Sequence, residues 1–361
     1  MYVIILVILI VGCLVLLCLY RNNKEWFEYP WEDKLNDEFD TQMHRRLDPI
    51  HKQYYIHNTK NLSMTSAMKF IRDDLVRYKG VIDQGRSILP KSTLIIAGLL
   101  QNEAGHIPLL RQRCAEMVDG WKDYRILIVE NNSEDDTRKY LLEWAEEDPR
   151  VVILCQDPFM TNTTECDLQY IFSLHDSNTL QHSPLPRRIE RMAFLRNVYM
   201  THIRQYYKNF DFLCVMDMDL QGQLYVDGFH HSIGLLRAHP EKMDGIAGNG
   251  MILRDENDYY YYDSFAYVED GEPMVWENAT EKSDHDHYVH MYITQRYSSR
   301  MIPDKVRSAF GGIAVYRLPA VLENHYDHSS IYYSCEHAYF HQNINMWVNP
   351  RFLLLIEKNG A

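Results

Sequence analysis

The chain has 361 residues, of which 46% are apolar and 24% are charged, and this composition is ordinary for a globular protein. It is long enough for one large domain or two small ones. Its net charge of -13 excludes a broad nucleic-acid-binding surface, because such a surface needs Lys and Arg clustered against phosphates.

The beginning of the chain predicts a membrane anchor. Residues Val3 to Tyr20 carry no charge and are almost wholly aliphatic, so as a helix they would cross a hydrocarbon core of about 30 Å. A cleaved signal peptide is the alternative, but no basic segment precedes the run and no clear small-residue cleavage site follows it. We predict one transmembrane helix at residues 1–20 and a single-pass protein of a Golgi-type, ER-type or other membrane, a host membrane included.

The side of the membrane stays open. Arg21 and Lys24 follow the anchor, and the positive-inside rule would place the rest of the chain in the cytosol. Four N-glycosylation motifs would favour the lumen if they are glycosylated, and they begin at Asn61, Asn131, Asn162 and Asn278. The five cysteines outside the anchor form an odd set without metal-binding spacing, so they do not decide the matter.

Residues 21–90 are polar, charged and aromatic, which predicts a stem with membrane-proximal helices. After Pro90, short apolar runs alternate with helical stretches. This alternation indicates an α/β fold with a parallel sheet and right-handed crossovers. The predicted strands are Leu94–Leu100, Tyr124–Val129 and Val151–Leu154, and the predicted helices reach Met117 and Glu146 and span Arg188–Tyr207.

The run from Phe210 to Gly222, FDFLCVMDMDLQG, is an apolar segment that ends in Asp217 and Asp219. It predicts a buried central strand with two carboxylates at its tip. Ionised carboxylates are costly there unless a cation compensates them, and α/β sheets bind ligands at the carboxyl ends of their strands. Mg²⁺ or Mn²⁺ is commonly held by one or two carboxylates and the phosphates of a substrate. The alternative is an Asp pair in a solvated loop.

Two common nucleotide-binding motifs are missing from the sequence. No Gly-x-Gly-x-x-Gly follows the first predicted strand, and no Gly-Lys-Ser/Thr loop occurs. A dinucleotide fold of the usual type and a P-loop ATPase are therefore disfavoured. If a nucleotide binds, its phosphates must be held by a metal and side chains.

Three segments taken in order resemble the motifs of GT-A-fold glycosyltransferases, particularly the family-2-like group. They are Val129–Thr137 (VENNSEDDT), Leu195–Asn197 and Met216–Asp219. Segment Arg188–Met200, together with ENNSEDDT, also resembles the fungal capsule-associated mannosyltransferases. The similarity is good over residues 93–222 and thin beyond them.

This resemblance implies a GT-A (Rossmann-like) domain with a mixed, mostly parallel sheet flanked by helices. Residues 91–222 would form its nucleotide-sugar-binding half and residues 223–361 its acceptor-binding half. The implied activity is a metal-dependent glycosyltransferase, a hexosyltransferase, with Mn²⁺ or Mg²⁺ as cofactor. It would move a sugar from a nucleotide-diphosphate donor to a hydroxyl of a glycan, glycoprotein or glycolipid acceptor.

The resemblance also implies roles for residues of the first half. Glu130 would lie near the nucleoside and Asp135 would shape the base pocket. Arg196 would pair with the pyrophosphate, Asp217 would bind the ribose and the metal, and Asp219 would bind the metal. A helix-capping turn is the alternative for the segment that follows Glu130.

That segment departs from the Asp-Asp-Gly-Ser pattern of the family. Glu130, Asn131 and Asn132 stand where the pattern has Asp, Asp and Gly. Asparagine tolerates the left-handed backbone conformation that glycine would supply, so we expect the turn to be kept.

In the second half, Gly311 and Gly312 open a predicted strand, and similar enzymes place such a loop beside the acceptor. A plain turn is the alternative. Glu336 stands where family-2-like enzymes carry the general base. His337 and His341 are four residues apart, so on a helix they share a face, and one of them could complete the metal shell. A structural histidine in an aromatic segment is the alternative.

Two further clusters remain open. The tyrosines between Tyr259 and Tyr297 could stack on sugar rings or close the core of a second subdomain. The segment Asp284–His290 is rich in His and Asp, but it indicates an exposed loop more than a zinc site.

Two other functions also remain open. They are a nucleotidyltransferase of similar fold and an inactive nucleotide-sugar-binding membrane protein. Glu336 as base would imply inversion at the transferred sugar, whereas likeness to the capsule mannosyltransferases would imply retention.

Overall fold

The computed structural model divides into two units, residues 1–80 and 81–361. It describes residues 79–164, 166, 185–222, 224–255, 258–271, 293–294, 296–297, 303–327 and 335–356, with only the backbone for 185–187, 253–255 and 258–260. The predicted anchor, most of the stem and the segment Asp284–His290 lie outside these residues. Within the described ranges, no helix combines the length and the apolar character needed to cross a membrane.

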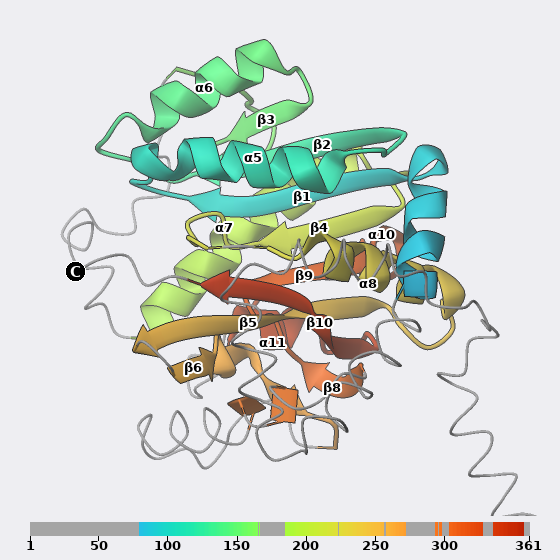
Figure 1. Ribbon diagram of the computed structural model, residues 1–361. Coiled ribbons are helices and arrows are strands. Elements are labelled where there is room, and N and C mark those ends of the chain that lie inside the picture. Colours follow the sequence, from blue (N-terminus) through green and yellow to red (C-terminus); the bar gives the residue numbers. More distant parts are fainter. Residues whose placement is uncertain are drawn as a thin grey trace, which may run out of the picture. The chain divides into compact units, whose positions relative to one another are not determined.

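Ten strands of the described part form one sheet, which runs through the middle of the second unit (Figure 1). Their order is β3-β2-β1-β4-β9-β5-β10-β8-β7, and β6 pairs with β5. The strands are β1 Thr93–Leu100, β2 Asp123–Glu130, β3 Val151–Leu154, β4 Phe212–Met216, β5 Gly245–Asp255, β6 Asp258–Tyr261, β7 Val268–Glu269, β8 Asp304–Ser308, β9 Ile313–Arg317 and β10 Met346–Ile356.

The first half of the sheet is parallel, as predicted. β1 pairs in parallel with β2 on one side and with β4 on the other, and β3 continues from β2. All residues of β3 and β4 are buried, which explains their unbroken apolar sequences, because a strand covered on both faces has no polar side. β4 lies between β1 and β9, so the prediction of a buried central strand is confirmed.

The second half follows a different pattern. β9 is antiparallel to both β4 and β5, whereas β5 and β10 are parallel to each other. The predicted mixed, mostly parallel α/β sheet is confirmed: seven of the ten strands in the described part run in one direction, and β6, β8 and β9 run in the other. Strands that return directly beside their neighbours, such as β6 after β5, must run antiparallel because no helix carries the chain back.

Helices cover both faces of the sheet (Figure 1). α5 and α8 contact each other on one face, and α7 and α11 contact each other on the other. α7 lies between β3 and β4 along the chain, so it leads into the strand that Asp217 follows. The helices that lie wholly within the described ranges include α5 Ile107–Val118, α6 Thr137–Glu147, α7 Leu185–Tyr206, α8 Val226–Ala238, α10 Leu318–Val321 and α11 Glu336–Phe340, with short 3-10 helices η1 Leu89–Lys91, η2 Ala104–His106 and η4 Ser264–Ala266.

Candidate functional site

The order of the strands reverses at β1. From β1 the chain proceeds outward through β2 and β3, and α7 then carries it back to β4 on the other side of β1. In open α/β sheets, ligands bind outside the carboxyl ends of the strands at such a reversal. Asp217 and Asp219 follow Met216, the last residue of β4. The two predicted carboxylates therefore lie where this topology favours a ligand.

Asp217 and Asp219 have different surroundings. The Asp217 side chain is 18% exposed and accepts hydrogen bonds from Arg196 Nη2 at 3.2 Å and from the Tyr262 hydroxyl at 3.2 Å. Burial raises the pKa of Asp217 to about 6, Arg196 opposes this shift, and the charge of Asp219 adds to it. Asp219 is exposed, and no residue of the described part donates a hydrogen bond to it. Asp219 is thus the carboxylate that is free to bind something else.

Arg196 on α7 joins two carboxylates. The residue is 2% exposed, and its Nε donates to Glu336 Oε1 at 3.0 Å while its Nη2 contacts Asp217. Its guanidinium also lies over the rings of Phe310 and Tyr326, at 5.3 and 5.8 Å from their centroids. Nη1 has no hydrogen-bond partner among the described residues. The structure therefore brings three predicted site residues together through one buried cation.

Glu336 begins α11 and is buried. Oε1 accepts the hydrogen bond from Arg196, and Oε2 accepts one from Cys335 Sγ at 3.3 Å. A general base must come within hydrogen-bond reach of the proton that it removes, although such contacts often form only in the substrate complex. Both oxygens of Glu336 are engaged inside the protein, so its predicted role requires that one of these contacts be exchanged.

His337 and His341 lie in the core behind Glu336, with their ring centroids 5.9 Å apart. Ser308 Oγ contacts Nδ1 of His341 at 2.9 Å, and Tyr316 Oη contacts its Nε2 at 2.8 Å, so neither nitrogen is free for a metal. Burial lowers the pKa of His341 to about 3. His337 stacks on Phe310 at 3.9 Å, and neither of its ring nitrogens has a hydrogen-bond partner in the described part. Burial, Arg196 and His341 lower the pKa of His337 well below its usual value.

The four predicted metal ligands do not form one ready-made site. Among the described residues, no group of three or more His, Cys, Asp or Glu side chains is arranged to hold a metal ion. Asp217 and Asp219 lie at the carboxyl end of β4, whereas His337 and His341 are packed among aromatic rings. An ion at this strand end would have to take its other ligands from water and from a substrate.

Gly311 and Gly312 form the turn that precedes β9, and both have a positive φ, at 61° and 80°. A Cβ on Gly311 would lie 2.3 Å from the carbonyl oxygen of Gly248, so the residue must be glycine to pack against β5. The carbonyl of Gly312 accepts a hydrogen bond from the Asp217 N–H at 2.9 Å. In this structure the two glycines hold the backbone of Asp217, and the predicted contact with an acceptor stays a prediction.

Glu130 ends β2 and is completely buried. Its Oε1 accepts a hydrogen bond from the Ser133 N–H at 2.6 Å, and its Oε2 pairs with Arg138 Nη1 at 2.5 Å. Both oxygens accept hydrogen bonds from this turn and from α6, so Glu130 holds the turn in this structure, and its predicted place near the nucleoside stays a prediction. Asn132 adopts a φ of 54°, which confirms that an asparagine supplies the left-handed residue of this turn.

Asp135 links the loops that follow β1 and β2. It accepts hydrogen bonds from the N–H groups of Thr137 at 3.0 Å and Ala104 at 3.1 Å. Burial would raise the pKa of Asp135, but the hydrogen bonds from Thr137 and Ala104 outweigh it and lower the pKa. Asp136 occupies the position before the first residue of α6.

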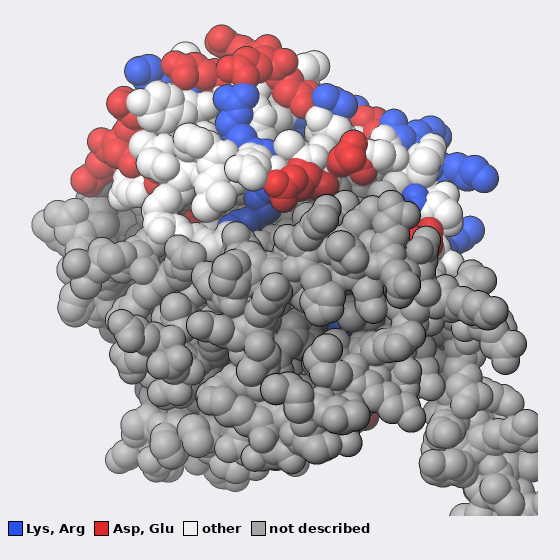
Figure 2. Space-filling view, viewed as in Figure 1, with Lys and Arg blue, Asp and Glu red and all other residues white. Residues whose placement is uncertain are grey.

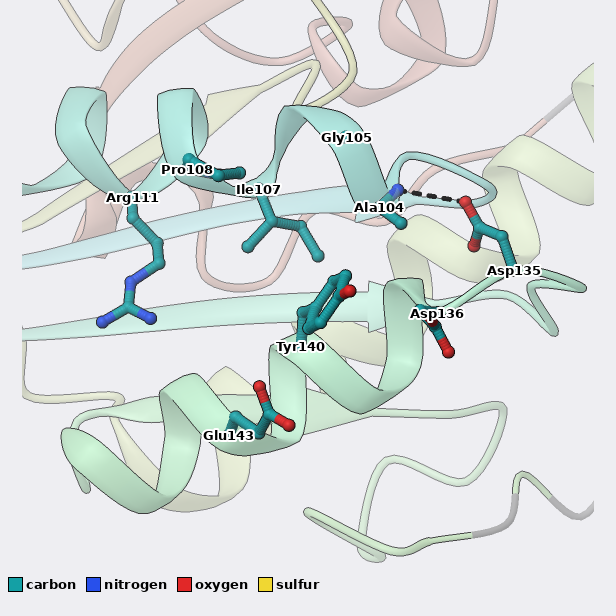
Figure 3. A pocket seen from close by; sticks show the side chains of 9 residues that line it. All are labelled: Ala104, Gly105, Ile107, Pro108, Arg111, Asp135, Asp136, Tyr140 and Glu143. Carbon is teal, nitrogen blue, oxygen red and sulfur yellow. Dashed lines mark hydrogen bonds between the residues drawn. The ribbon is translucent and has the colours of Figure 1, made fainter.

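Asp135 also lies at the rim of a pocket of about 800 Å³ between the first turns of α5 and α6 (Figure 3). Figure 3 shows Tyr140 of α6 and Ile107 of α5 pointing toward each other across this pocket, with Arg111 and Glu143 farther along the helices. Acidic, basic and uncharged side chains are mixed on the described part of this face of the molecule (Figure 2). The pocket is open and mixed in charge, and it adjoins the loops that follow β1 and β2.

A disulfide joins Cys155 and Cys166, whose Cα atoms are 5.5 Å apart. The odd number of cysteines gave no sign of this pair, because sequence spacing does not reveal which two thiols meet. Cys114, Cys214 and Cys335 are free and buried. Cys155 Sγ lies 3.1 Å from Nη2 of Arg138, so the disulfide adjoins the partner of Glu130.

Sequence reasoning missed two residues beside Asp217. The Tyr262 hydroxyl donates to Asp217 Oδ2, and Asp263 follows it with a left-handed backbone, φ 59°. Burial raises the pKa of Asp263 well above its usual value, as do the charges of Asp217 and Glu336, while Arg196 opposes them. The surrounding run of tyrosines was the only signal in the sequence for Tyr262 and Asp263.

Three of the four tyrosines of this run whose side chains the structure describes have a structural role. Tyr261, Tyr267 and Tyr297 are buried, and their ring centroids lie 5.8 to 6.2 Å apart. Of the two alternatives for the tyrosines, these three close the core. The fourth, Tyr262, donates its hydroxyl hydrogen bond to Asp217 at the carboxyl end of β4.

No protein-family model matches the chain, and no curated protein matches it. Among solved structures, residues 1–349 of S. aureus TarS match with 9% identity and a TM-score of 0.37, covering 71% of this chain and 57% of that one. The mannosyltransferase PcManGT from Pyrobaculum calidifontis, in complex with GDP-Man and Mn²⁺, matches with 12% identity and a TM-score of 0.38, covering 84% of this chain and 67% of that one. The chain thus spans little more than half of the TarS chain, and likenesses this weak carry no argument about its family.

Proposed function

We propose that this chain is a metal-dependent glycosyltransferase of the GT-A type. It moves a sugar, a hexose, from a nucleotide-diphosphate donor to a hydroxyl of a glycan, glycoprotein or glycolipid. The observation that carries the proposal is the pair Asp217 and Asp219 at the carboxyl end of β4, beside the reversal of strand order at β1. Asp219 is exposed there and has no hydrogen-bond partner among the described residues.

Asp217 and Asp219 at the carboxyl end of β4 fit Mg²⁺ or Mn²⁺ bound together with a substrate. These ions prefer oxygen ligands and are commonly held by one or two carboxylates, with water and phosphate oxygens completing the shell. Asp219 would bind the ion, and Asp217 would support it from its place between Arg196 and Tyr262. The bound ion would neutralise the diphosphate that leaves as the glycosidic bond breaks.

The remaining predicted residues take supporting roles in this proposal. Glu130 and Asp135 hold the turns beside the nucleoside instead of contacting it, because their oxygens already accept hydrogen bonds from the protein. Arg196 orients Asp217 and Glu336. Glu336 stays the proposed base, and an acceptor hydroxyl would replace Cys335 Sγ at its Oε2.

We further propose that residues 1–20 anchor the chain in a membrane and that the second unit faces an oxidising compartment. Disulfides persist in the ER lumen and outside the cell and are rare in the cytosol, so the Cys155–Cys166 bond favours the lumenal side. Treatment of intact and permeabilised membrane vesicles with a protease tests this placement. Protection of the second unit in intact vesicles is expected, and its cleavage there would contradict the proposal.

A screen of nucleotide sugars with Mn²⁺ tests the activity. The expected result is release of a nucleoside diphosphate from one donor, lost when EDTA removes the metal. Release of pyrophosphate from a nucleoside triphosphate and a sugar phosphate would instead identify a nucleotidyltransferase. Donor binding without any release would identify an inactive binding protein.

A further inference from the structure

Arg113 on α5 is a buried cation that the sequence did not single out. It is 5% exposed, and its Nη1 donates to the carbonyl of Leu220 at 3.0 Å while its Nη2 donates to the carbonyl of Gly222 at 2.7 Å. No carboxylate within the described ranges forms an ion pair with it, and burial lowers its pKa. A buried guanidinium without a counter-ion is costly. Its two hydrogen bonds to carbonyls offset part of this cost, so we ask what they do for the loop that carries the carbonyls.

These two carbonyls belong to the loop that carries Asp219. The loop starts at Asp217, whose N–H is held by the carbonyl of Gly312. Met218 is buried, Asp219 is exposed, and Gly222 has a φ of 107°. Arg113 donates hydrogen bonds to the carbonyls of Leu220 and Gly222 at the far end of this loop. Asp219 therefore lies between two hydrogen-bonded parts of the backbone, while its own side chain stays free.

The loop is held from both faces of the sheet. Arg196 reaches Asp217 from α7, and Arg113 reaches Leu220 and Gly222 from α5, on the opposite face (Figure 1). Planar guanidinium groups suit this work because their N–H groups point in fixed directions and stay charged when buried. Lysine would keep the charge but lacks the planar fork that reaches two carbonyls in fixed directions.

We infer that Arg113 is a positioning residue for Asp219: it fixes the loop so that the free carboxylate meets the divalent cation of the donor complex. This inference rests on the proposed function. Arg113, and not its neighbour Arg111, holds the loop, because Arg111 forms an exposed ion pair between α5 and α6 with Glu147.

The test compares Arg113→Lys and Arg113→Met with Arg111→Met in the full chain. The readout is Mn²⁺ affinity in the presence of UDP or GDP, followed by the electron paramagnetic resonance signal of free Mn²⁺, with thermal unfolding measured in parallel. We expect Arg113→Met to weaken Mn²⁺ binding about tenfold or more, Arg113→Lys by a smaller factor, and Arg111→Met by less than about twofold. Arg113→Lys keeps the buried charge and serves if Arg113→Met does not fold.

A double-mutant cycle separates positioning from simple stabilisation. In an Asp219→Asn background, Arg113→Lys should cause no further loss of Mn²⁺ affinity, because the group through which it acts has already been removed. Wild-type Mn²⁺ affinity in Arg113→Lys, or equal losses with and without Asp219, would overturn the inference alone. A wild-type chain that binds no Mn²⁺ with either nucleotide would overturn the proposed function and this inference with it.

Discussion

An arginine pairs with the carboxylate at the end of β2 and with the carboxylate that follows β4, and these two pairs differ in which polar atoms they leave free. At the end of β2, Glu130 is completely buried, and the three guanidinium nitrogens of Arg138 contact Glu130, Thr163, Thr164 and Cys155. After β4, Asp217 is partly exposed, and Arg196 keeps Nη1 without a partner in the described part. We call them the closed pair (Glu130–Arg138) and the open pair (Asp217–Arg196).

The comparison teaches that an acidic residue at a strand end is not by itself a binding residue. In the closed pair every polar atom has a partner inside the protein, as expected of a group that stabilises a turn. In the open pair some hydrogen-bonding capacity is unused, and Asp219 stands free two residues away. Spare capacity, not the presence of a carboxylate, distinguishes the candidate site.

Removal of Asp219 should have the largest effect. We expect Asp219→Ala to lower metal-dependent donor turnover by a factor on the order of 10³, because one carboxylate ligand of the cation is lost. The midpoint of thermal unfolding should stay unchanged, since Asp219 is exposed and unpaired within the described ranges. The measurement is nucleoside diphosphate release with Mn²⁺, and Asp119→Ala on an exposed turn is the control. Full turnover in Asp219→Ala would remove the metal assignment.

Breaking the closed pair should destabilise the fold. Arg138→Met leaves Glu130 charged and buried, so the free energy of unfolding should fall by about 3 kcal/mol. Arg111→Met, which breaks the exposed pair with Glu147, should cost less than about 1 kcal/mol. Urea denaturation measures both. Equal losses in the two variants would show that the closed pair is not structural.

The disulfide should contribute to the free energy of unfolding, because it holds the loop that contacts the closed pair. The double substitution of Cys155→Ser and Cys166→Ser frees the loop that carries Thr163, which contacts Arg138. We expect a loss of about 2 to 3 kcal/mol in the free energy of unfolding, the usual effect of opening a loop of this length. Dithiothreitol should lower the stability of the wild type by a similar amount and leave the double variant unchanged. A reductant effect of the same size in both would place the sensitive group elsewhere.

The loss of folding stability at low pH should arise in neither the closed pair nor the open pair, but at a buried histidine. Burial lowers the pKa of His231 on α8 to about 3, whereas an unfolded histidine titrates near 6.5. Below pH 6.5 the unfolded chain therefore binds a proton that the folded chain does not, so stability falls as the pH falls, by about 2 kcal/mol between pH 7 and pH 5. In His231→Gln this part of the pH dependence should disappear in urea titrations. The exposed His325 gives the control, His325→Gln, and an unchanged slope in His231→Gln would contradict the assignment.

The smallest effect is expected for Tyr262→Phe. This change removes one hydrogen bond to Asp217 and keeps the ring, so turnover should fall by a few fold, which corresponds to about 1 kcal/mol. Tyr267→Phe, in the tyrosine core, is the matched control and should leave turnover unchanged. A larger loss in the control would mean that the tyrosine core, and not the contact with Asp217, sets the activity.

The sequence predicted the parallel half of the sheet well. β1, β2 and β3 were expected at Leu94–Leu100, Tyr124–Val129 and Val151–Leu154, and they lie within one residue of these bounds. Short, continuous apolar runs bounded by polar turns are reliable signals, because burial of both faces leaves no room for polar residues. The strand that bears Asp217 was found for the same reason.

The sequence by itself determined the four strands of the first half of the sheet and the two carboxylates that follow one of them, since these properties depend on local pattern. Only the tertiary structure decided how the polar groups are shared out. The bond between Cys155 and Cys166, the engagement of both nitrogens of His341, and the grip of Arg113 on Leu220 and Gly222 all join residues from different elements. A charged side chain either pairs within the fold or stays free for a ligand, depending on partners that are distant in the sequence. Local sequence does not specify those partners.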